Sequence, residues 1–448
     1  MVCEAVILAA GLGTRMVSET PKALHHLGGV PLLGWVEGAC RTAVGRPPLV
    51  VIGPEDSAAR SLLPSDVRFV VQSERRGTGH AMQQTEAELR GRCDLVLIAT
   101  ADMPLVRPES LRRLIDTQQS HAGPLSLMTV ARTEARGFGR VQRGADGRVI
   151  AVIEEAVATP EQLQIEEFNA SLYCVDAAWL WGHLARLQPS PSGEVYLTDL
   201  VALAAADAGA ATIRVDDPEE VIGINTREHL AEAEAVLRRR INRAWMLAGV
   251  TLIDPDSTYI GPAVRLAAEV EVLPNTHVRG ETSIGRGSRL GPNTIVTDSV
   301  VGEKCRIECS VVEGARLDDE VHIGPFAHLR PGARLGRGVH MGNFGEVKNS
   351  VLGPGVKMGH FSYVGDAEIG RETNIGAGTI TCNFSRDGKK NRTTVGEGVF
   401  LGSDSLLVAP VQIGDGSATG AGSVVTRDVP PGSLAVGMPA RVIRTAKE

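Results

Sequence analysis

The first residues that suggest chemistry form a glycine-rich turn near the N-terminus. A Gly-Leu-Gly turn at 11–13 follows the apolar run 5–10, and Arg15 and Lys22 come soon after it. Backbone N–H groups of such a turn, together with two cationic side chains, can bind a polyphosphate. The turn is not a Walker loop, and Met16 stands where a GxGxxG motif has its third glycine. In isolation, a tight structural loop is the ordinary interpretation.

A carboxylate follows another apolar run in this half of the chain. Asp102 comes after the run 95–99 and stands two residues before Pro104, where it could bind a metal ion. Gln72 also follows a predicted strand. Because ligands of parallel sheets bind beyond the carboxyl ends of the strands, we expect Gly11, Gln72 and Asp102 to lie close together. For an isolated Asp, a turn or helix N-cap is the more common role.

A second group of polar residues lies in the C-terminal half. Arg330, Lys348, His360, Tyr363 and Asn374 flank small apolar residues of a repeat, so we expect them to line one strip. Arginine and lysine together suit a phosphate. Histidine can accept a proton near neutral pH, although a lone histidine is more often structural than catalytic.

The elements that must position this second group follow an unusual period. Between residues 284 and 425, small apolar residues recur every six positions and are usually followed by glycine. Six is neither the helical nor the strand period, but it is the period of the hexapeptide β-helix. Each turn of the prism takes three hexapeptides. Residues 250–448 are therefore predicted to form a left-handed parallel β-helix, whereas a glycine-rich disordered region would lack apolar residues in fixed register.

The elements that position the first group alternate between strand and helix. Apolar runs at 49–52, 69–71 and 95–99 read as strands, and 83–89 reads as a helix. This alternation predicts a Rossmann-like α/β domain with a mostly parallel sheet over residues 1–226. Apolar residues at helical spacing predict a helical linker over 227–249.

Composition narrows the classes of protein. The chain has 448 residues, enough for two or three domains, with 43% hydrophobic and only 4% aromatic residues. Its net charge of -7 argues against nucleic acid as the main partner. Seven scattered cysteines without a CxxC pair indicate neither a disulfide framework nor a zinc site. Without a signal peptide or a stretch long enough to span a bilayer, we expect a soluble cytoplasmic protein.

An ordered set of motifs in the N-terminal half resembles the nucleotidyltransferases that act on sugar 1-phosphates. The matching segments are 8–16, 21–22, Gln72 with 77–81, 102–105, 137–140, Glu154, Asn169, 193–199 and 223–225. Over nearly the full chain, the sequence is similar to the bacterial family of bifunctional N-acetylglucosamine-1-phosphate uridylyltransferases and glucosamine-1-phosphate acetyltransferases.

The resemblance implies two substrates and a metal ion for the N-terminal domain. UTP would contact Leu8, Ala9, Ala10, Gly11, Arg15, Lys22, Gln72, Gly77 and Thr78. N-acetylglucosamine 1-phosphate would contact Thr100, Ala101, Asp102, Gly139, Glu154, Asn169 and Asn225, and Asp102 and Asn225 would also bind Mg²⁺. The sugar phosphate would attack the α-phosphorus of UTP, a reaction that requires mainly alignment and charge neutralisation.

The C-terminal half contains the acetyltransferase motifs of the same family. They occur at 329–332, 342–344, 359–366, 374–379, 382–384, 402–404 and 421–422. The resemblance implies that His360 takes a proton from the 2-ammonium group of glucosamine 1-phosphate. Arg330, Lys348, Tyr363 and Asn374 would bind this sugar phosphate, and Ala377, Asn383, Phe384, Ser403, Ala421 and Arg441 would bind acetyl-CoA. Members of this family associate as homotrimers through the β-helix.

Some positions depart from the family pattern. In the N-terminal domain, Thr100-Ala101 replaces Tyr-Gly, Ala170-Ser171 replaces Thr-Gly, and Glu155-Ala156 stands where a basic residue is usual. In the C-terminal domain, Phe384 replaces Tyr, Gly345 replaces a bulkier residue, and Met438 replaces an Arg. The segment 384–394 breaks the six-residue period and is rich in Arg and Lys, which predicts an excursion loop that covers acetyl-CoA or is merely a surface loop.

Three functions are compatible with these observations. The first is a bifunctional enzyme that acetylates glucosamine 1-phosphate and then uridylylates the product, making UDP-N-acetylglucosamine. The second is a single-activity nucleotidyltransferase for another sugar 1-phosphate, with the β-helix as a trimerisation scaffold. The third is a regulatory subunit that binds a sugar nucleotide. The polar strip in the β-helix argues against the second, and paired metal ligands argue against the third.

Overall fold

The computed structural model describes residues 1–56, 58–132, 136–191 and 193–445. Its internal contacts divide the chain into an N-terminal unit, Met1–Leu237, and a C-terminal unit, Arg238–Glu448. The division falls inside helix α8, Arg227–Leu247, which ends just before Gly249, a glycine with φ of 92°. A helix was predicted for this segment, and glycine is the usual residue beyond a helix end.

The N-terminal unit is built on a nine-stranded sheet with the order β11-β7-β10-β6-β1-β4-β5 along its main path. Every strand on this path runs in one direction except β10, which is antiparallel to both of its neighbours, β6 and β7. The predicted mostly parallel α/β architecture is confirmed. The sheet strands are β1 Cys3–Leu8, β4 Leu49–Ile52, β5 Arg68–Val71, β6 Leu95–Thr100, β7 Leu125–Ala131, β8 Arg140–Arg143, β9 Val149–Ile153, β10 Glu167–Asp176 and β11 Ala210–Arg214, and β2 His26–Leu27 pairs with β3 Val30–Pro31 apart from it.

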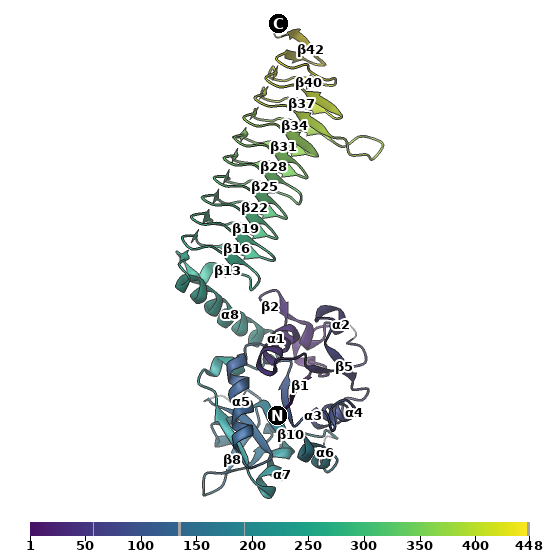
Figure 1. Cartoon of the computed structure of the whole chain (residues 1–448), viewed down its shortest axis with the longest axis vertical. Helices are drawn as coiled ribbons and strands as arrows, with labels where there is room; N and C mark the ends of the chain where they lie inside the picture. The colour runs from purple at the N-terminus through teal and green to yellow at the C-terminus, as the bar shows by residue number, and fades with distance from the viewer. Residues whose placement is uncertain (57, 133–135, 192, 446–448) are drawn as a thin grey trace. The chain divides into compact units, whose positions relative to one another are not determined.

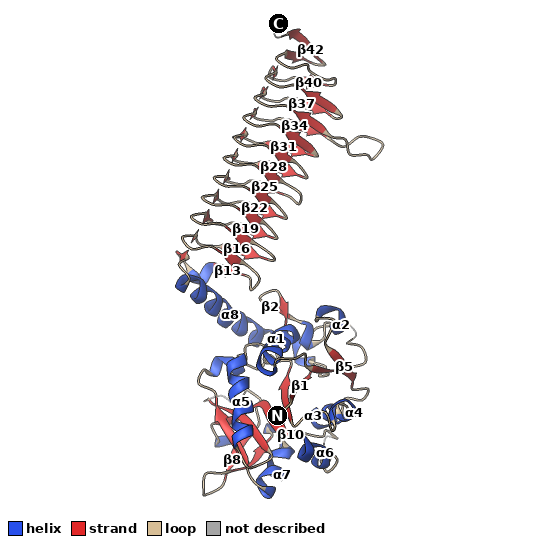
Figure 2. Cartoon of the chain, in the orientation of Figure 1, coloured by secondary structure: helices blue, strands red, loops and turns tan. Residues whose placement is uncertain are grey.

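Helices separate many of these strands along the chain (Figure 2), although β7 to β10 follow one another without an α-helix between them. They are α1 Leu32–Val44, α2 Ala59–Leu62, α3 Thr78–Gln83, α4 Glu86–Leu89, α5 Pro108–Ser120, α6 Ala177–Leu184 and α7 Asp199–Asp207, with short 3₁₀ turns η1 Thr14–Met16, η2 Lys22–Leu24, η3 Glu155–Val157, η4 Gln162–Gln164 and η5 Pro218–Val221. The prediction of one helix over 83–89 was wrong. The Thr85 hydroxyl donates to the Met82 carbonyl at 2.7 Å, and this local bond competes with helix continuation between α3 and α4.

Strand β1 lies in the interior of the sheet, between β6 and β4, and is almost completely buried. It pairs in parallel with β4 and β6, so the chain segments that follow β1, β5 and β6 emerge at one edge. These segments carry Gly11, Gln72 and Asp102, the three residues expected to converge.

Beyond α8 and a 3₁₀ turn (η6, Pro255–Ser257), the described part of the C-terminal unit is a stack of strand coils (Figure 1). Three ladders form the walls of a prism. Wall 1 consists of β12 Thr251–Leu252, β15 Glu271–Val272, β18 Arg289–Leu290, β21 Arg306–Ile307, β24 His322–Ile323, β27 His340–Met341, β30 Lys357–Met358, β33 Asn374–Ile375, β36 Phe400–Leu401, β39 Ala418–Thr419, β41 Leu434–Gly437 and β42 Ala440–Arg444.

The other two walls contain the remaining strands. Wall 2 consists of β13 Thr258–Ile260, β16 Thr276–Arg279, β19 Ile295–Thr297, β22 Val311–Glu313, β25 His328–Leu329, β28 Gly345–Lys348, β31 Ser362–Gly365, β34 Ile380–Cys382, β37 Leu406–Val408 and β40 Val424–Val425. Wall 3 consists of β14 Arg265–Leu266, β17 Ser283–Ile284, β20 Val300–Val301, β23 Arg316–Leu317, β26 Arg334–Leu335, β29 Val351–Leu352, β32 Ala367–Ile369, β35 Thr393–Val395 and β38 Val411–Ile413. The described strand pairs are parallel apart from the final β41–β42 hairpin, as predicted for a left-handed β-helix.

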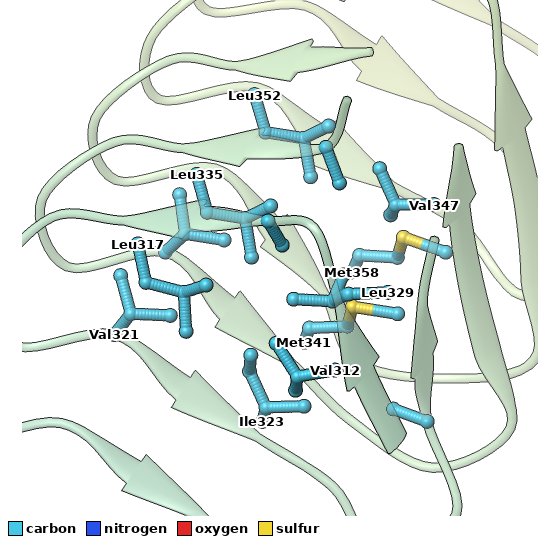
Figure 3. Packing of buried hydrophobic residues seen from close by; sticks show 14 of the residues in the cluster. Val312, Leu317, Val321, Ile323, Leu329, Leu335, Met341, Val347, Leu352 and Met358 are labelled. Atoms are coloured by element: carbon cyan, nitrogen blue, oxygen red, sulfur yellow. The ribbon is translucent and has the colours of Figure 1, made fainter. Parts of the chain in front are cut away.

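The six-residue period places one apolar side chain of each hexapeptide inside the prism. Residues such as Leu329, Val347 and Leu352 are completely buried and stack into a continuous core, which Figure 3 shows around Met341 and Met358. The glycines that follow inward residues have a packing role. A Cβ on Gly285 would lie 2.5 Å from the Gly302 carbonyl oxygen on the next coil. Glycine at this corner therefore allows close approach of neighbouring coils.

Gly345 illustrates how the core adapts to a departure from the family pattern. A Cβ there would lie 2.9 Å from Met341 Cε and 3.2 Å from Met358 Cε. The two methionines reach from wall 1 toward the space that a larger side chain would need. Long, flexible thioether side chains suit such irregular gaps.

Candidate functional site

A pocket of about 570 Å³ lies at the carboxyl edge of the N-terminal sheet. Its lining includes every residue predicted to contact UTP, namely Leu8, Ala9, Ala10, Gly11, Arg15, Lys22, Gln72, Gly77 and Thr78. From the predicted sugar-phosphate set, it includes Thr100, Ala101, Asp102, Glu154 and Asn225, but not Gly139 or Asn169. Segments distant in sequence thus meet at the edge where the topology predicts a ligand.

The predicted metal ligands both contact one cation in this structure. Lys22 Nζ donates to Asp102 Oδ2 at 2.6 Å and to Asn225 Oδ1 at 3.1 Å. Burial opposes ionisation of Asp102, but the Lys22 ammonium outweighs it and holds the pKa of this carboxyl below its ordinary value. Two oxygens that converge on a positive charge are the type of donors that Mg²⁺ prefers.

The glycine-rich turn brings Lys22 to this position. Gly13 has φ of 64°, and a Cβ there would lie 2.5 Å from Lys22 Cβ. No atom lies within 4 Å of a Cβ built on Gly11, so its bare backbone faces open space beside the pocket. Arg75, a residue that sequence reasoning missed, lines the same pocket, and its Nε donates to the Ala10 carbonyl at 2.6 Å.

Gln72 is almost completely buried and has a fixed amide orientation. Its Nε2 donates to the Gly77 carbonyl at 3.1 Å and lies 3.0 Å from His80 Nδ1. Because a carbonyl can only accept, the amide nitrogen must face Gly77. Thr78 is fixed similarly, since its hydroxyl accepts from the Leu197 N–H at 3.0 Å.

Glu154 also lines the pocket. Its Oε1 accepts from the Thr198 hydroxyl at 2.8 Å. Burial raises the pKa of Glu154 above its ordinary value, and the nearby carboxylates of Asp199 and Glu194 add to the effect. Thr198 belongs to a matching motif, but its bond to Glu154 could not be predicted from the sequence.

Asn169 lies behind the pocket wall. It is 1% exposed, its Nδ2 donates to the Tyr173 hydroxyl at 2.6 Å, and its Oδ1 accepts from the Ser171 N–H at 3.2 Å. The structure therefore gives Asn169 internal partners, and Ser171 and Tyr173 line the pocket in its place. Ser171 has φ of 53°, the left-handed conformation that the glycine of the family pattern adopts readily.

In the C-terminal unit, four of the candidate residues share the corner between walls 1 and 2. Strand register aligns His360 with Ala377, Ser403 and Ala421 on successive coils. His360 is exposed, and no hydrogen bond to it is found within the described residues. The proposed base and three predicted acetyl-CoA contacts thus share one corner column.

Wall 2 brings together the predicted phosphate ligands. Lys348 pairs in register with Gly365, and Arg330 donates its N–H to the Val347 carbonyl in the adjacent strand. A Cβ on Gly365 would lie 2.3 Å from the Tyr363 hydroxyl, so Tyr363 leans over Gly365 toward the Lys348 column. Arg330 also pairs with Glu346 at 2.8 Å, which raises the pKa of the arginine.

Asn374 is a correction to the predicted strip. It lies on wall 1, where it pairs with Lys357, whereas Arg330, Lys348 and Tyr363 belong to wall 2. The reason is the geometry of the prism. Successive inward residues along the chain belong to different walls, so a residue that lies between two of them can belong to either wall. One chain therefore places Asn374 on another face from the remaining sugar-phosphate residues.

A groove of about 580 Å³ runs along wall 2 beside the His360 corner. Outward residues on successive coils, including Tyr363, Ile380, Leu406 and Val424, form its floor, and Met438 contributes to its lining. Gly378, Asp404 and Gly422 line its edge, each next to a predicted acetyl-CoA residue.

The remaining predicted acetyl-CoA residues lie elsewhere. Asn383 is 7% exposed, and its Nδ2 donates to Asp366 at 2.5 Å. Phe384 is 69% exposed and begins the loop that stands out from the stack beside β34 (Figure 1). Arg441 lies on β42 and donates to the Ala440 carbonyl. None of these three lines the groove.

The excursion loop is confirmed by the register of wall 3. Val351 pairs with Glu368, 17 positions on, but Ala367 pairs with Thr393, 26 positions on. The loop brings Lys390, which sequence reasoning missed, beside Lys348. This second ammonium lowers the pKa of Lys348.

The described residues contain neither a larger cluster of metal-binding side chains nor a helix suited to span a membrane. No group of three or more His, Cys, Asp or Glu side chains that could bind a metal ion occurs among them. Among the same residues, no helix has the length and apolar character needed to cross a bilayer.

Comparisons with known proteins agree with this geometry. The MobA-like NTP transferase domain family matches residues 5–246, and the hexapeptide repeat of succinyl-transferase matches residues 392–427. The Bifunctional protein GlmU of Trichlorobacter lovleyi is 42% identical, covering 99% of this chain and 97% of the relative. The GlmU proteins of Pelobacter propionicus and Streptococcus mutans are 42% and 40% identical, covering 98% and 97% of this chain and 96% and 95% of theirs. The chain therefore belongs to the bifunctional GlmU family, and the predicted enzyme that makes UDP-N-acetylglucosamine by acetyl transfer and uridylyl transfer is confirmed.

Proposed function

We propose that the pocket of the N-terminal unit carries out uridylyl transfer and that the His360 corner of the C-terminal unit carries out acetyl transfer. The family implies nucleotide and acetyl-CoA substrates and a metal requirement. The observation that carries the assignment of residues is their separation into two sites. The predicted UTP residues line one pocket, and His360 aligns with three predicted acetyl-CoA residues at one corner.

In the uridylyl pocket, Arg15 and Lys22 neutralise the phosphates of UTP beside the glycine-rich turn. Glu154 accepts a hydroxyl of N-acetylglucosamine 1-phosphate, while Asn169 holds the wall behind it. The phosphate of this sugar attacks the α-phosphorus, a P–O bond forms, and the bond to pyrophosphate breaks. The protein supplies alignment and charge and needs no base, because the attacking phosphate is already ionised.

Asp102 and Asn225 would hold Mg²⁺. The donor set fits, because a carboxylate and an amide oxygen already converge on the Lys22 ammonium. When bound, the metal ion would neutralise charge on the transferred phosphate group. Lys22, once released from these oxygens, is free to bind a phosphate of UTP.

Gln72 accounts for the choice of base. Its Nε2 is committed to Gly77, and no donor from the described residues reaches its Oε1. That oxygen is left to accept a hydrogen bond. Uracil presents an N3–H donor, whereas cytosine has an unprotonated N3, so this amide orientation favours UTP over CTP.

In the acetyltransferase, His360 accepts a proton from the 2-ammonium of glucosamine 1-phosphate. The free amine attacks the thioester carbonyl carbon of acetyl-CoA. The C–N bond forms, the C–S bond breaks, and the departing thiolate is protonated. Arg330, Lys348 and Lys390 bind the sugar phosphate, since three cations suit a dianion.

The acetyltransferase site is incomplete in one chain, which supports a homotrimer. Asn374 lies on a different wall from Lys348, and His360 is open to solvent. The five phenylalanines of the C-terminal unit, Phe326, Phe344, Phe361, Phe384 and Phe400, are each more than half exposed. Aromatic residues exposed in this number indicate a covered surface. We therefore propose that wall 1 of one copy faces wall 2 of the next.

A cytoplasmic location is also part of the proposal. All seven cysteines are free thiols, and reducing compartments maintain cysteines in that form.

Product analysis by mass spectrometry tests the assignment. The purified protein is given glucosamine 1-phosphate, acetyl-CoA, UTP and Mg²⁺ in parallel with His360→Ala and Asp102→Ala. The parent should form UDP-N-acetylglucosamine. His360→Ala should lose about 10²- to 10⁴-fold of the acetyl transfer rate yet still use supplied N-acetylglucosamine 1-phosphate. Asp102→Ala should accumulate that intermediate.

The two variants serve as controls for each other. If either substitution removes both activities, the assignment of separate sites is wrong or the chain is misfolded, and thermal unfolding distinguishes these cases. If His360→Ala acetylates at the parental rate, His360 is not the base.

A further inference from the structure

A buried carboxylate links the two lysines of the proposed phosphate site to the excursion loop. Asp366 directly follows β31 at the corner between walls 2 and 3 and is 8% exposed. Its Oδ1 accepts from Asn349 Nδ2 at 2.6 Å, and its Oδ2 accepts from Asn383 Nδ2 at 2.5 Å. Both oxygens therefore hold side chains from the coils on either side.

The same residue contacts both ends of the loop. Asn383 stands just before the loop, and its carbonyl accepts from the Asn391 N–H at 2.7 Å. Thr393 stands just after the loop, and its N–H donates to the Asp366 carbonyl at 3.3 Å. The closure of the loop thus depends on one corner residue and its amide partner.

The charges around Asp366 are mostly positive. Lys348 and Lys390 are its charged neighbours, and Asp366 donates its N–H to the Lys348 carbonyl at 3.1 Å. The groups that act on Lys348 are Lys390, Arg330 and Asp366, of which only Asp366 is negative. Without it, the two ammoniums would repel each other with no compensating charge.

We propose that Asp366 is a positioning residue for acetyl transfer, which holds the loop through Asn383 and keeps Lys348 and Lys390 together as a phosphate-binding pair. This inference rests on the proposed function, because it assigns the two lysines to the phosphate of glucosamine 1-phosphate. Asp366 does not touch the substrate. It acts through the lysines, so its loss should weaken binding of the sugar phosphate more than binding of acetyl-CoA.

The experiment measures acetyl transfer kinetics of the full-length chain with Asp366→Asn. This variant removes the charge and replaces one acceptor oxygen with a donor. We expect the KM for glucosamine 1-phosphate to rise about tenfold, with KM for acetyl-CoA within twofold and uridylyl transfer unchanged. Loss of the negative charge should also lower the pKa of Lys348 further. The alkaline limb of kcat/KM should therefore move to lower pH, a change that a purely structural role would not produce.

Asp298 provides a matched control. It occupies the same corner of an earlier coil, has φ of 48°, and its Oδ1 accepts from the Glu281 N–H at 2.9 Å. Asp298→Asn should leave both KM values and the pH profile unchanged. If Asp366→Asn behaves like Asp298→Asn, or lowers kcat and thermal stability without changing KM, the proposal is wrong.

Two further variants keep the test decisive. If Asp366→Asn is insoluble, Asn349→Ala removes one bond to Asp366 but keeps its charge, and should give a smaller rise in KM without a shift of the alkaline limb. An unchanged KM in that variant would then contradict the proposal. Lys348→Ala, measured in parallel, separates the proposed role of Asp366 from the assignment of the phosphate site. If it leaves KM for glucosamine 1-phosphate unchanged, the phosphate site itself is misassigned. If Lys348→Ala raises this KM but Asp366→Asn does not, the phosphate site stands and the proposed role of Asp366 is wrong.

Discussion

The N-terminal pocket is lined within one chain by segments that follow several different strands, and its central polar side chains already have partners. Lys22 lies between Asp102 and Asn225, and Glu154 has Thr198 as a partner. The C-terminal candidate site has the opposite character. Its base is exposed, its cations Lys348 and Lys390 lie beside each other, and Asn374 is on another wall.

The difference follows from the two scaffolds. An open α/β sheet has loops of varied length at one edge, and these can close around a ligand. A hexapeptide prism repeats the same three flat walls on every coil, so it stacks side chains into columns but cannot enclose a substrate. Such a scaffold needs an excursion loop, a second copy, or both, to complete a site.

Subunit mixing gives the largest expected effect. It tests most directly whether the C-terminal site needs two copies of the chain while the N-terminal pocket needs one. Lys348→Ala and Asn374→Ala should each be strongly impaired in acetyl transfer. If each site combines wall 2 of one copy with wall 1 of another, each mixed trimer of the two coexpressed variants should regain about one of its three sites. The measurement is acetyl transfer by doubly tagged, copurified protein.

The N-terminal unit supplies the control for this mixing. Asp102→Ala and Glu154→Ala affect one pocket within one chain, so their mixture should regain no uridylyl transfer. Restoration there would contradict the idea of a self-contained pocket. Failure of the Lys348 and Asn374 mixture would place both residues in a site built by one chain.

Lowering the pH should reveal how much the ion pair of Asp102 and Lys22 stabilises the N-terminal unit. Asp102 has a lowered pKa in the folded state, so it stabilises the fold above its unfolded pKa of about 3.9, and this stabilisation is lost as pH falls through the folded pKa. At pH 7, Asp102→Asn should lower the free energy of unfolding by about 1.5–3 kcal/mol. The difference from the parent should persist to about pH 5 and shrink below about pH 4.

Urea unfolding at each pH measures this difference. Asp116→Asn, an exposed position on α5, is the control and should change the free energy of unfolding little at any pH. A constant difference between the Asp102→Asn variant and the parent down to pH 3 would show that the Lys22 pair does not stabilise the fold.

Glycines should respond differently in the two units. Gly285→Ala brings a Cβ to 2.5 Å from the backbone of the next coil, which cannot rotate away, so the C-terminal unit should lose about 1–3 kcal/mol of stability. Gly11→Ala meets no atom within 4 Å, so stability should change by less than about 0.5 kcal/mol. Its KM for UTP should rise, because the methyl group occupies the space of the ligand. Calorimetry and initial rates test both variants, and a stable Gly285→Ala protein would contradict the packing role.

The sequence predicted the β-helix and its core because the six-residue period directly specifies which side chain points inward. It also predicted that Gly11, Gln72 and Asp102 meet, since strand ends of a parallel sheet lie at one edge. It could not place Asn374, because the wall of a residue depends on the coil length, which varies among 16, 17, 18 and 26 positions.

The residues that were missed share a physical cause. Thr198 contacts Glu154, and Lys390 lies beside Lys348. In each pair, more than 40 positions of sequence separate the two residues. No local pattern marks such contacts. The resemblance predicts that Asn169 and Asn383 contact ligands, and in this chain their amides also donate to Tyr173 and Asp366. Motif matching identifies residues near a site without distinguishing those that touch the ligand from those that support its wall.

The smallest expected effect concerns Gly345. The neighbours of this glycine are side chains that can move, whereas the neighbour of Gly285 is fixed backbone. A Cβ there meets the terminal methyl groups of Met341 and Met358, which can rotate, rather than backbone. Gly345→Ala should therefore change the free energy of unfolding by less than about 1 kcal/mol, whereas Gly345→Val should cost about 1–3 kcal/mol. The double variant Gly345→Val with Met341→Val has a shorter side chain beside the new valine. It should recover part of that loss, because the two side chains compete for the same space. Denaturant unfolding of the three variants measures these differences, and equal costs for Gly345→Ala and Gly285→Ala would mean that the methionines are as rigid as backbone.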